Sequence, residues 1–261
     1  MKQKPRYKIR FPASDTRQLS QDEAYFFLEE HATGEPQRIR FHDYGELYNR
    51  AGLYEQLFYD RLKCDSPAKV AGLLKKVVDE ASGKFSQLRI IDLGAGNGIM
   101  GECLLKYGVA RLIGVDILQE AAHAVLRDRP SVYDTYYLAD FTQLQPDIRE
   151  ELSCWRLNCM VTVAALGFGD IPPTAFLEAF NLIEEQGWVA FNIKETFFDN
   201  CDNSGFSVFI KHLILTEYLD LYHLERYQHR LSIDGEPLYY YAVIGRKNQN
   251  IPPDFFERIT S

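Results

Sequence analysis

A glycine-rich loop between a predicted strand and a predicted helix constrains this chain more than any other feature. Residues 88–93 form a short apolar stretch, and residues 94–98 read Gly-Ala-Gly-Asn-Gly before a helical pattern that runs to Tyr107. Glycines let the main chain approach a ligand closely, and a helix start offers free backbone N–H groups. A strand, glycine loop and helix in this order are typical of an α/β protein that binds a ligand at the loop.

Two common ligands of such loops are disfavoured by the residues around it. The dinucleotide fingerprint G-x-G-x-x-G needs a small residue at the position where this chain has Ile99. The Gly-Lys-Ser/Thr sequence of a phosphate-binding Walker loop is also missing. The loop therefore predicts a ligand other than a dinucleotide or a nucleoside triphosphate.

Predicted strands and helices alternate on both sides of this loop. Short apolar strands are predicted at residues 88–93, 112–115, 133–138, 157–164 and 188–193, and helices at 68–81, 120–127, 174–185 and 207–219. Residues 222–233 and 238–244 instead flank an Asp234-Gly235 turn and predict a β-hairpin. Alternation favours right-handed crossovers, so we predict an α/β fold. Its core is a doubly wound, seven-stranded, mostly parallel sheet with a C-terminal antiparallel hairpin.

Acidic residues end the predicted strands around the loop. Asp92 closes the strand before the loop, and Asp116 closes the next one. Asp140 closes the third strand and is followed by Phe141. The carboxyl ends of parallel strands meet at one edge of a sheet, where open α/β sheets bind ligands. A carboxylate accepts hydrogen bonds from both hydroxyls of a ribose, and a carboxylate beside a ring suits an adenine. The pattern predicts an adenosine-like ligand.

With these segments in view, the chain resembles the class I S-adenosylmethionine-dependent methyltransferases. The resemblance covers roughly residues 87–246 and is carried by IIDLGAGNGIMGECL, LIGVDI, YYLADF and GWVAFNIK, followed by the predicted hairpin. It implies a Rossmann-like methyltransferase fold and S-adenosylmethionine as cofactor. The sulfonium and ammonium of that cofactor also suit acidic strand ends better than a pyrophosphate does.

The resemblance implies a set of cofactor contacts. The loop would pass beside the methionine part, Asp92 would hold its ammonium, and Asp116 would bind the ribose. The implied cofactor-binding residues are Asp92, Gly94, Ala95, Gly96, Gly98, Asp116, Ile117, Asp140, Phe141, Val163, Tyr44 and Tyr48. Simpler interpretations stay open, namely helix capping by Asp92 and core packing of the apolar and tyrosine side chains.

The amino-acid composition disfavours several classes of binding partner. Acidic residues number 37 against 29 basic ones, and the net charge of −8 disfavours nucleic acid and anionic membranes as partners. The five cysteines contain no CxxC pair, so neither a metal site nor a disulfide framework is predicted, and a reducing, cytoplasmic setting fits best. No apolar run is long enough to span a membrane.

Three residues are candidates for acid–base catalysis. A base is needed when the acceptor is a hydroxyl, because its proton must leave. The candidates are His42 just before the predicted lid helix, Glu195 at the end of the fifth strand, and Asp170 beyond the fourth strand. A solvated surface role is the alternative for each. Pro172-Pro173 is interpreted as a helix start.

We predict three segments. Residues 1–64 form a helical lid or extension that includes Phe26 and Phe27, residues 65–246 form the cofactor-binding domain, and residues 247–261 form a tail. The acceptor pocket is expected between the N-terminal segment and the loop at residues 194–206.

The expected activity is methyl transfer to an oxygen or nitrogen atom of a small organic acceptor, by a monomer or homodimer. The alternatives are a protein side-chain methyltransferase, a catalytically silent cofactor-binding subunit, and a nicotinamide enzyme.

Overall fold

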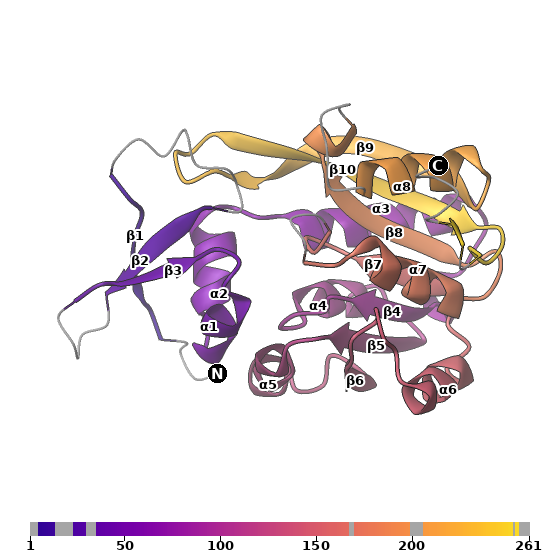
Figure 1. Ribbon diagram of the computed structural model, residues 1–261, viewed down its shortest axis with the longest axis horizontal. Helices are drawn as coiled ribbons and strands as arrows, with labels where there is room; N and C mark the ends of the chain where they lie inside the picture. The colour runs from indigo at the N-terminus through magenta and orange to yellow at the C-terminus, as the bar shows by residue number, and fades with distance from the viewer. Residues whose placement is uncertain are drawn as a thin grey trace.

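The large sheet has seven strands, and along the chain the parallel strands come first and the antiparallel hairpin last, as predicted. The computed structural model describes residues 5–13, 23–29, 35–166, 170–198, 206–252 and 254–255. The sheet runs β6-β5-β4-β7-β8-β10-β9 (Figure 1). Its strands are β4 (Arg89–Leu93), β5 (Arg111–Asp116), β6 (Thr135–Leu138), β7 (Cys159–Thr162), β8 (Trp188–Lys194), β9 (Leu219–Leu231) and β10 (Pro237–Lys247). Strands β4 to β8 are parallel to one another, and β10 pairs antiparallel with both β8 and β9.

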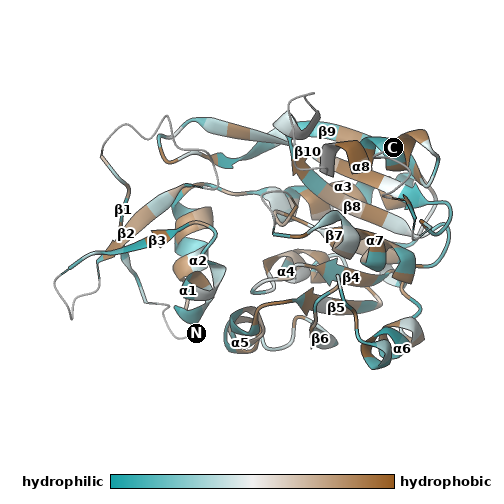
Figure 2. Cartoon of the chain, viewed as in Figure 1, coloured by the Kyte–Doolittle hydropathy of each residue, from teal (hydrophilic) through white to brown (hydrophobic). Residues whose placement is uncertain are grey.

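Helices cover both faces of this sheet, as a doubly wound fold requires. They are α3 (Ser66–Glu80), α4 (Ile99–Leu105), α5 (Gln119–Asp128), α6 (Pro146–Cys154), α7 (Pro173–Leu182) and α8 (Phe206–Leu215). Neighbouring strand residues point to opposite faces, so Ile90 packs with α3 and α4 while Ile91 packs with α6 and α7. Because both faces are covered there, the central strands β4, β5, β7 and β8 are buried along almost their whole length, and most of β8 is hydrophobic (Figure 2).

The expectation of a helical N-terminal segment is wrong in part. This unit contains a three-stranded antiparallel sheet of β1 (Lys8–Arg10), β2 (Tyr25–Glu29) and β3 (Gln37–Arg40). The helical part is confined to α1 (Tyr44–Asn49), α2 (Leu53–Glu55) and a π-helical turn, η1 (Gln56–Arg61). In β2 the buried residues Phe26 and Leu28 alternate with less buried ones, which is the period of a strand, and adjacent aromatics favour strands.

The N-terminal unit has its own small core and faces the large sheet through α1. Ile9, Phe26 and Ile39 from its strands pack on Leu47, Leu53 and Leu57 from its helical part. Phe26 is therefore a core residue of this unit and is not among the residues that line the candidate site. Helix α1 packs on α5, at the side of the sheet where β5 ends (Figure 1).

The residues after the hairpin are also packed. Ile251 and Phe255, which fall in the predicted tail, are buried with α7 and α8. The Ile251 N–H donates to the side chain of Asn181 in α7. The described part of this segment is thus continuous with the main core.

Candidate active site

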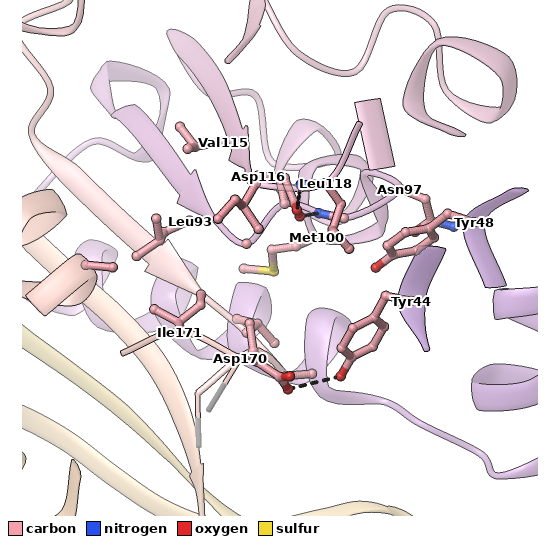
Figure 3. A pocket seen from close by; sticks show the side chains of 18 of the residues that line it. Tyr44, Tyr48, Leu93, Asn97, Met100, Val115, Asp116, Leu118, Asp170 and Ile171 are labelled. Atoms are coloured by element: carbon pink, nitrogen blue, oxygen red, sulfur yellow. Dashed lines mark hydrogen bonds between the residues drawn. The ribbon is translucent and has the colours of Figure 1, made fainter. Parts of the chain in front are cut away.

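A cavity of about 470 Å³ lies at the carboxyl ends of β4, β5, β6 and β7, with α1 on its other side. This volume is within the usual range of small-molecule sites. Figure 3 shows Asp116 and Met100 on one side of it, Tyr44 and Tyr48 with Asn97 on another, and Asp170 with Ile171 on a third. The charged side chains in its lining are Asp43, Asp116, Asp140 and Asp170, and none of the described lining residues is Lys or Arg. A cavity with this charge favours a cationic ligand.

The glycine loop forms one wall of this cavity. Gly94, Ala95 and Gly96 line it, whereas Gly98 caps the start of α4 and packs against Val132 and Tyr133 instead. The role of opening the helix therefore fits Gly98, and the structure does not bring this residue into the cavity. Gly96 has φ +53°, a conformation that side chains disfavour, and its Cα faces the Tyr48 hydroxyl.

We expect Gly96→Ala to weaken cofactor binding at least tenfold. An added Cβ would lie 2.5 Å from the Tyr48 hydroxyl oxygen, so the loop or the lid tyrosine must shift. Gly108→Ala is a matched control, because Gly108 also has positive φ, at +73°, yet a Cβ there would meet nothing within 4 Å. Calorimetric titration with S-adenosylhomocysteine measures both. Equal affinity of the two variants would contradict the role of the Gly96 wall.

Asp116 ends β5 and holds the glycine loop in place. Its carboxylate accepts hydrogen bonds from the N–H groups of Gly96 and Leu118, each at 2.9 Å. Burial raises the pKa of this carboxyl, and hydrogen bonds from the backbone N–H groups of Leu118, Gly96 and Ile117 oppose the rise. A carboxylate can accept about four hydrogen bonds, so acceptor capacity is left for a ligand in the cavity that Asp116 lines.

Asp92 is placed differently from the expectation. It is 1% exposed, is not among the described lining residues, and accepts a hydrogen bond of 2.6 Å from the Tyr133 hydroxyl. Asp92 thus lies beneath the loop, where its carboxylate accepts the hydrogen bond from Tyr133 and does not line the cavity. Burial raises the pKa of Asp92 to about 7, and the bond from Tyr133 opposes the rise.

This shift predicts a pH dependence of stability. The pKa of Asp92 is higher in the folded chain than its ordinary 3.8, so the stability from its bound proton is complete below about pH 4 and is lost as pH rises to about 7. In the wild type the free energy of unfolding should fall by about 2–4 kcal/mol across this pH window, and we expect Asp92→Asn to remove this fall. Urea unfolding between pH 4 and 8 measures it, with the exposed Asp79→Asn as control. Parallel pH profiles for wild type and Asp92→Asn would refute the assignment.

Two of the three predicted acid–base residues meet in the cavity wall. His42 Nδ1 lies 3.2 Å from the Asp170 carboxylate, although 128 residues separate them. The Tyr44 hydroxyl donates to the same carboxylate at 3.2 Å and lies 3.4 Å from His42 Nδ1 (Figure 3). Burial and the neighbouring Asp170 raise the pKa of Tyr44 well above its ordinary value, so this hydroxyl stays protonated.

Local structure explains this meeting. His42 follows the buried Phe41 at the end of β3, and Tyr44 begins α1. Asp170 stands just before Pro172 and Pro173, which start α7 as the sequence predicted. With Nδ1–H directed to a carboxylate, the neutral imidazole carries its lone pair on Nε2. A histidine with this partner is equipped to accept a proton.

Glu195, the third candidate, is not brought to the cavity. It begins η3 (Glu195–Phe198), and its carboxylate accepts a hydrogen bond of 2.7 Å from Arg226 of β9. It is not among the described lining residues. Of the loop predicted to flank the acceptor, residues 199–205 lie outside the described part of the chain.

The remaining predicted cofactor residues do line the cavity. They are Ile117, which is exposed, Asp140, Phe141, Val163, Tyr44 and Tyr48. Phe141 is also buried in the sheet core, as the core-packing interpretation expected, and its contact with a cofactor stays a prediction. Asp140 accepts bonds from the backbone N–H and hydroxyl of Thr142, which lower the pKa of its carboxyl.

Sequence reasoning missed the side chains that support the loop from behind. The Tyr136 hydroxyl donates to the Gly96 carbonyl at 2.9 Å, and Arg129 donates to the Asn97 carbonyl at 3.0 Å. Arg129 also pairs with Glu55 of α2 and so ties the N-terminal unit to the loop. The only sequence signal was the cluster of tyrosines at residues 133–137, interpreted as part of a strand.

A second missed group holds the end of β7. The Asn192 side chain accepts a bond from the N–H of Ala164, a cavity residue, and donates to the Tyr227 hydroxyl at 2.8 Å. Tyr227 lies 2.6 Å from Ser66, which lies 2.6 Å from Nδ1 of His229. Burial lowers the pKa of His229 well below its ordinary value, so the chain of bonds is neutral.

Solved structures with this architecture are numerous. A protein from Thermoplasma acidophilum matches with a TM-score of 0.51 and 14% identity, over 78% of this chain and 96% of its own. A proposed RNA methyltransferase from Pyrococcus horikoshii matches with a TM-score of 0.50 and 15% identity, over 68% of this chain and 83% of its own. The protein has the fold of the class I S-adenosylmethionine-dependent methyltransferases.

The sheet order with its antiparallel β10 is the feature shared within this methyltransferase fold. N-methyltransferase NodS from Bradyrhizobium japonicum, in complex with S-adenosylhomocysteine, matches at a TM-score of 0.48 and 18% identity, over 69% of this chain and 85% of its own. The sequence matches no family model and no curated protein.

Two features are absent among the described residues. None of their helices combines the length and apolar character needed to cross a membrane. Nowhere among them do three or more His, Cys, Asp or Glu side chains gather in a way that suits a metal ion.

Proposed function

We propose that this protein is an S-adenosylmethionine-dependent methyltransferase that acts on a small organic acceptor. The methyltransferase fold supports this enzyme class. The observation that carries the proposal is the cavity at the strand ends, which has acidic side chains and no described Lys or Arg in its lining. Asp116 retains acceptor capacity for ribose hydroxyls, and the Gly96 wall allows close approach of a ligand.

Within this proposal the pair of His42 and Asp170 favours a hydroxyl as the group that is methylated. When bound, S-adenosylmethionine supplies a methyl group already activated by its sulfonium. The protein must then align the acceptor and remove its proton. His42 takes that proton, Asp170 fixes the imidazole and stabilises its charge, and Tyr44 orients Asp170. An amine acceptor would not need this pair.

The proposal is tested by release of S-adenosylhomocysteine from S-adenosylmethionine across pools of metabolites, with mass detection of a product heavier by one CH₂. The expected result is turnover with at least one pool. Thermal unfolding with S-adenosylmethionine or NAD is the companion measurement, because a bound ligand raises the melting temperature. Stabilisation by NAD alone would overturn the proposal.

A further inference from the structure

A small second compartment adjoins the main cavity behind His42, Tyr44 and Asp170. It has a volume of about 40 Å³. Both cavities are lined by His42, Tyr44, Tyr54, Ala164 and Asp170. Most of the residues that line only the small compartment come from the N-terminal unit and the hairpin, and they include Phe41, Phe58 and Arg230.

Arg230 is a buried cation in this compartment. It is 4% exposed, and one of its N–H groups donates to the carbonyl of Leu231 at 2.8 Å. Its guanidinium carbon lies 5.5 Å from the Phe41 ring centre and 5.9 Å from that of Phe58. Among the described residues, no carboxylate lies within ion-pair distance of it. Asp170 lines the same compartment, but its carboxylate is bonded to His42 and Tyr44.

A buried cation without a carboxylate partner, as Arg230 is among the described residues, is costly. Burial lowers the pKa of Arg230, yet a guanidinium stays charged because its ordinary pKa of 12.5 is so high. The two distant ring contacts compensate only a small part of the lost hydration. Where a fold retains such a group beside a cavity, a ligand that supplies the opposite charge accounts for it.

We propose that Arg230 binds a carboxylate group of the methyl acceptor in this small compartment. This inference rests on the proposed function, because it specifies the acceptor of that reaction. The planar guanidinium matches a carboxylate with two parallel hydrogen bonds. A volume of about 40 Å³ holds about three water-sized atoms, which is the size of a carboxylate.

The shared lining residues connect this group to the chemistry. An acceptor with its carboxylate at Arg230 extends past His42 and Asp170 into the main cavity, where its hydroxyl meets the proposed base. No described Lys or Arg lines the main cavity, so a negatively charged group of the acceptor is better placed beside Arg230 in the small compartment. The acceptor is accordingly a small hydroxy acid.

The first test uses the wild-type protein with and without saturating S-adenosylhomocysteine. Formate, acetate, benzoate and 4-hydroxybenzoate are each titrated by calorimetry against their uncharged primary amides. We expect at least one acid to bind at least about tenfold more tightly than its amide, as a charge-assisted pair predicts. If no acid in the panel exceeds its amide under either condition, the inference is overturned.

The second test compares three variants. Arg230→Met should abolish the preference for the acid, Arg230→Lys should reduce it, and Arg111→Met should leave it unchanged. Arg111 is the control because it also donates to a neighbouring carbonyl, that of Ala110, but is exposed. The melting temperature of ligand-free Arg230→Met should equal or exceed that of wild type, since an unpaired buried charge is removed. A retained preference in Arg230→Met overturns the inference, and a lower melting temperature indicates a structural role instead.

A measurement of S-adenosylhomocysteine binding distinguishes a failure of this inference from a failure of the proposed function. If S-adenosylhomocysteine binds and no acid is preferred, only the inference fails. If the cofactor itself does not bind, the proposed function fails, while the acid titration without cofactor still reports on Arg230.

Discussion

Asp116→Asn is expected to weaken S-adenosylmethionine binding by about 100-fold or more. The carboxylate already accepts bonds from Gly96 and Leu118, and the proposed ribose hydroxyls would use its remaining acceptor capacity. Hydrogen bonds to a charged group contribute about 1.5–3 kcal/mol each. Asparagine keeps the size of the side chain but replaces one acceptor oxygen by a donor. Calorimetric titration with S-adenosylmethionine measures the loss.

Asp134→Asn is the matched control for this prediction. Its carboxylate also accepts a backbone hydrogen bond, from Leu112 at 2.7 Å, but at the opposite edge of the sheet and outside the cavity lining. It should leave cofactor affinity unchanged. Should Asp116→Asn bind the cofactor within about threefold of wild type, the placement of the ribose at β5 is wrong.

His42→Ala is expected to lower kcat for a hydroxyl acceptor by about 10²–10⁴-fold, the usual contribution of a positioned base. Cofactor affinity should stay close to wild type, because His42 itself is not among the cofactor residues implied by the family resemblance. Asp170→Asn should lower kcat less, since the imidazole remains but loses the carboxylate that orients it. The rate of S-adenosylhomocysteine release at saturating cofactor measures both effects.

His123→Ala, on the exposed face of α5, serves as the control for general effects of losing a histidine. Its kcat should match wild type. An unchanged kcat in His42→Ala would show that the acceptor needs no base, and an amine or thiolate would then replace the hydroxyl in the proposed reaction.

The main domain could be predicted because its signals are local. The apolar strands, the glycine loop and the Asp234-Gly235 turn each specify their own backbone, and parallel alternation brings the strand ends together. That is why Asp116, Gly94, Gly96, Ile117 and Phe141 all reach one cavity. The division into segments at residues 64 and 246 stays a prediction.

The incorrect predictions concern residues whose structure depends on contacts between segments that are far apart in the sequence. Residues 25–29 alternate over too few positions to separate a strand from a helix face, and only pairing with β1 and β3 fixes them as a strand. Glu195 sits at a strand end like Asp116, but Arg226 of the hairpin engages it. Asp92 is covered by Tyr133, whose ring occupies space left by Gly101 and Gly114.

By itself the sequence determined a doubly wound sheet, a loop that a ligand can approach, and acidic strand ends, because these depend on short-range pattern and on the geometry of parallel strands. Only the tertiary structure decided that His42 meets Asp170 and that Arg230 is buried without a described carboxylate partner. Each of these depends on packing between segments more than 40 residues apart, which no local pattern encodes.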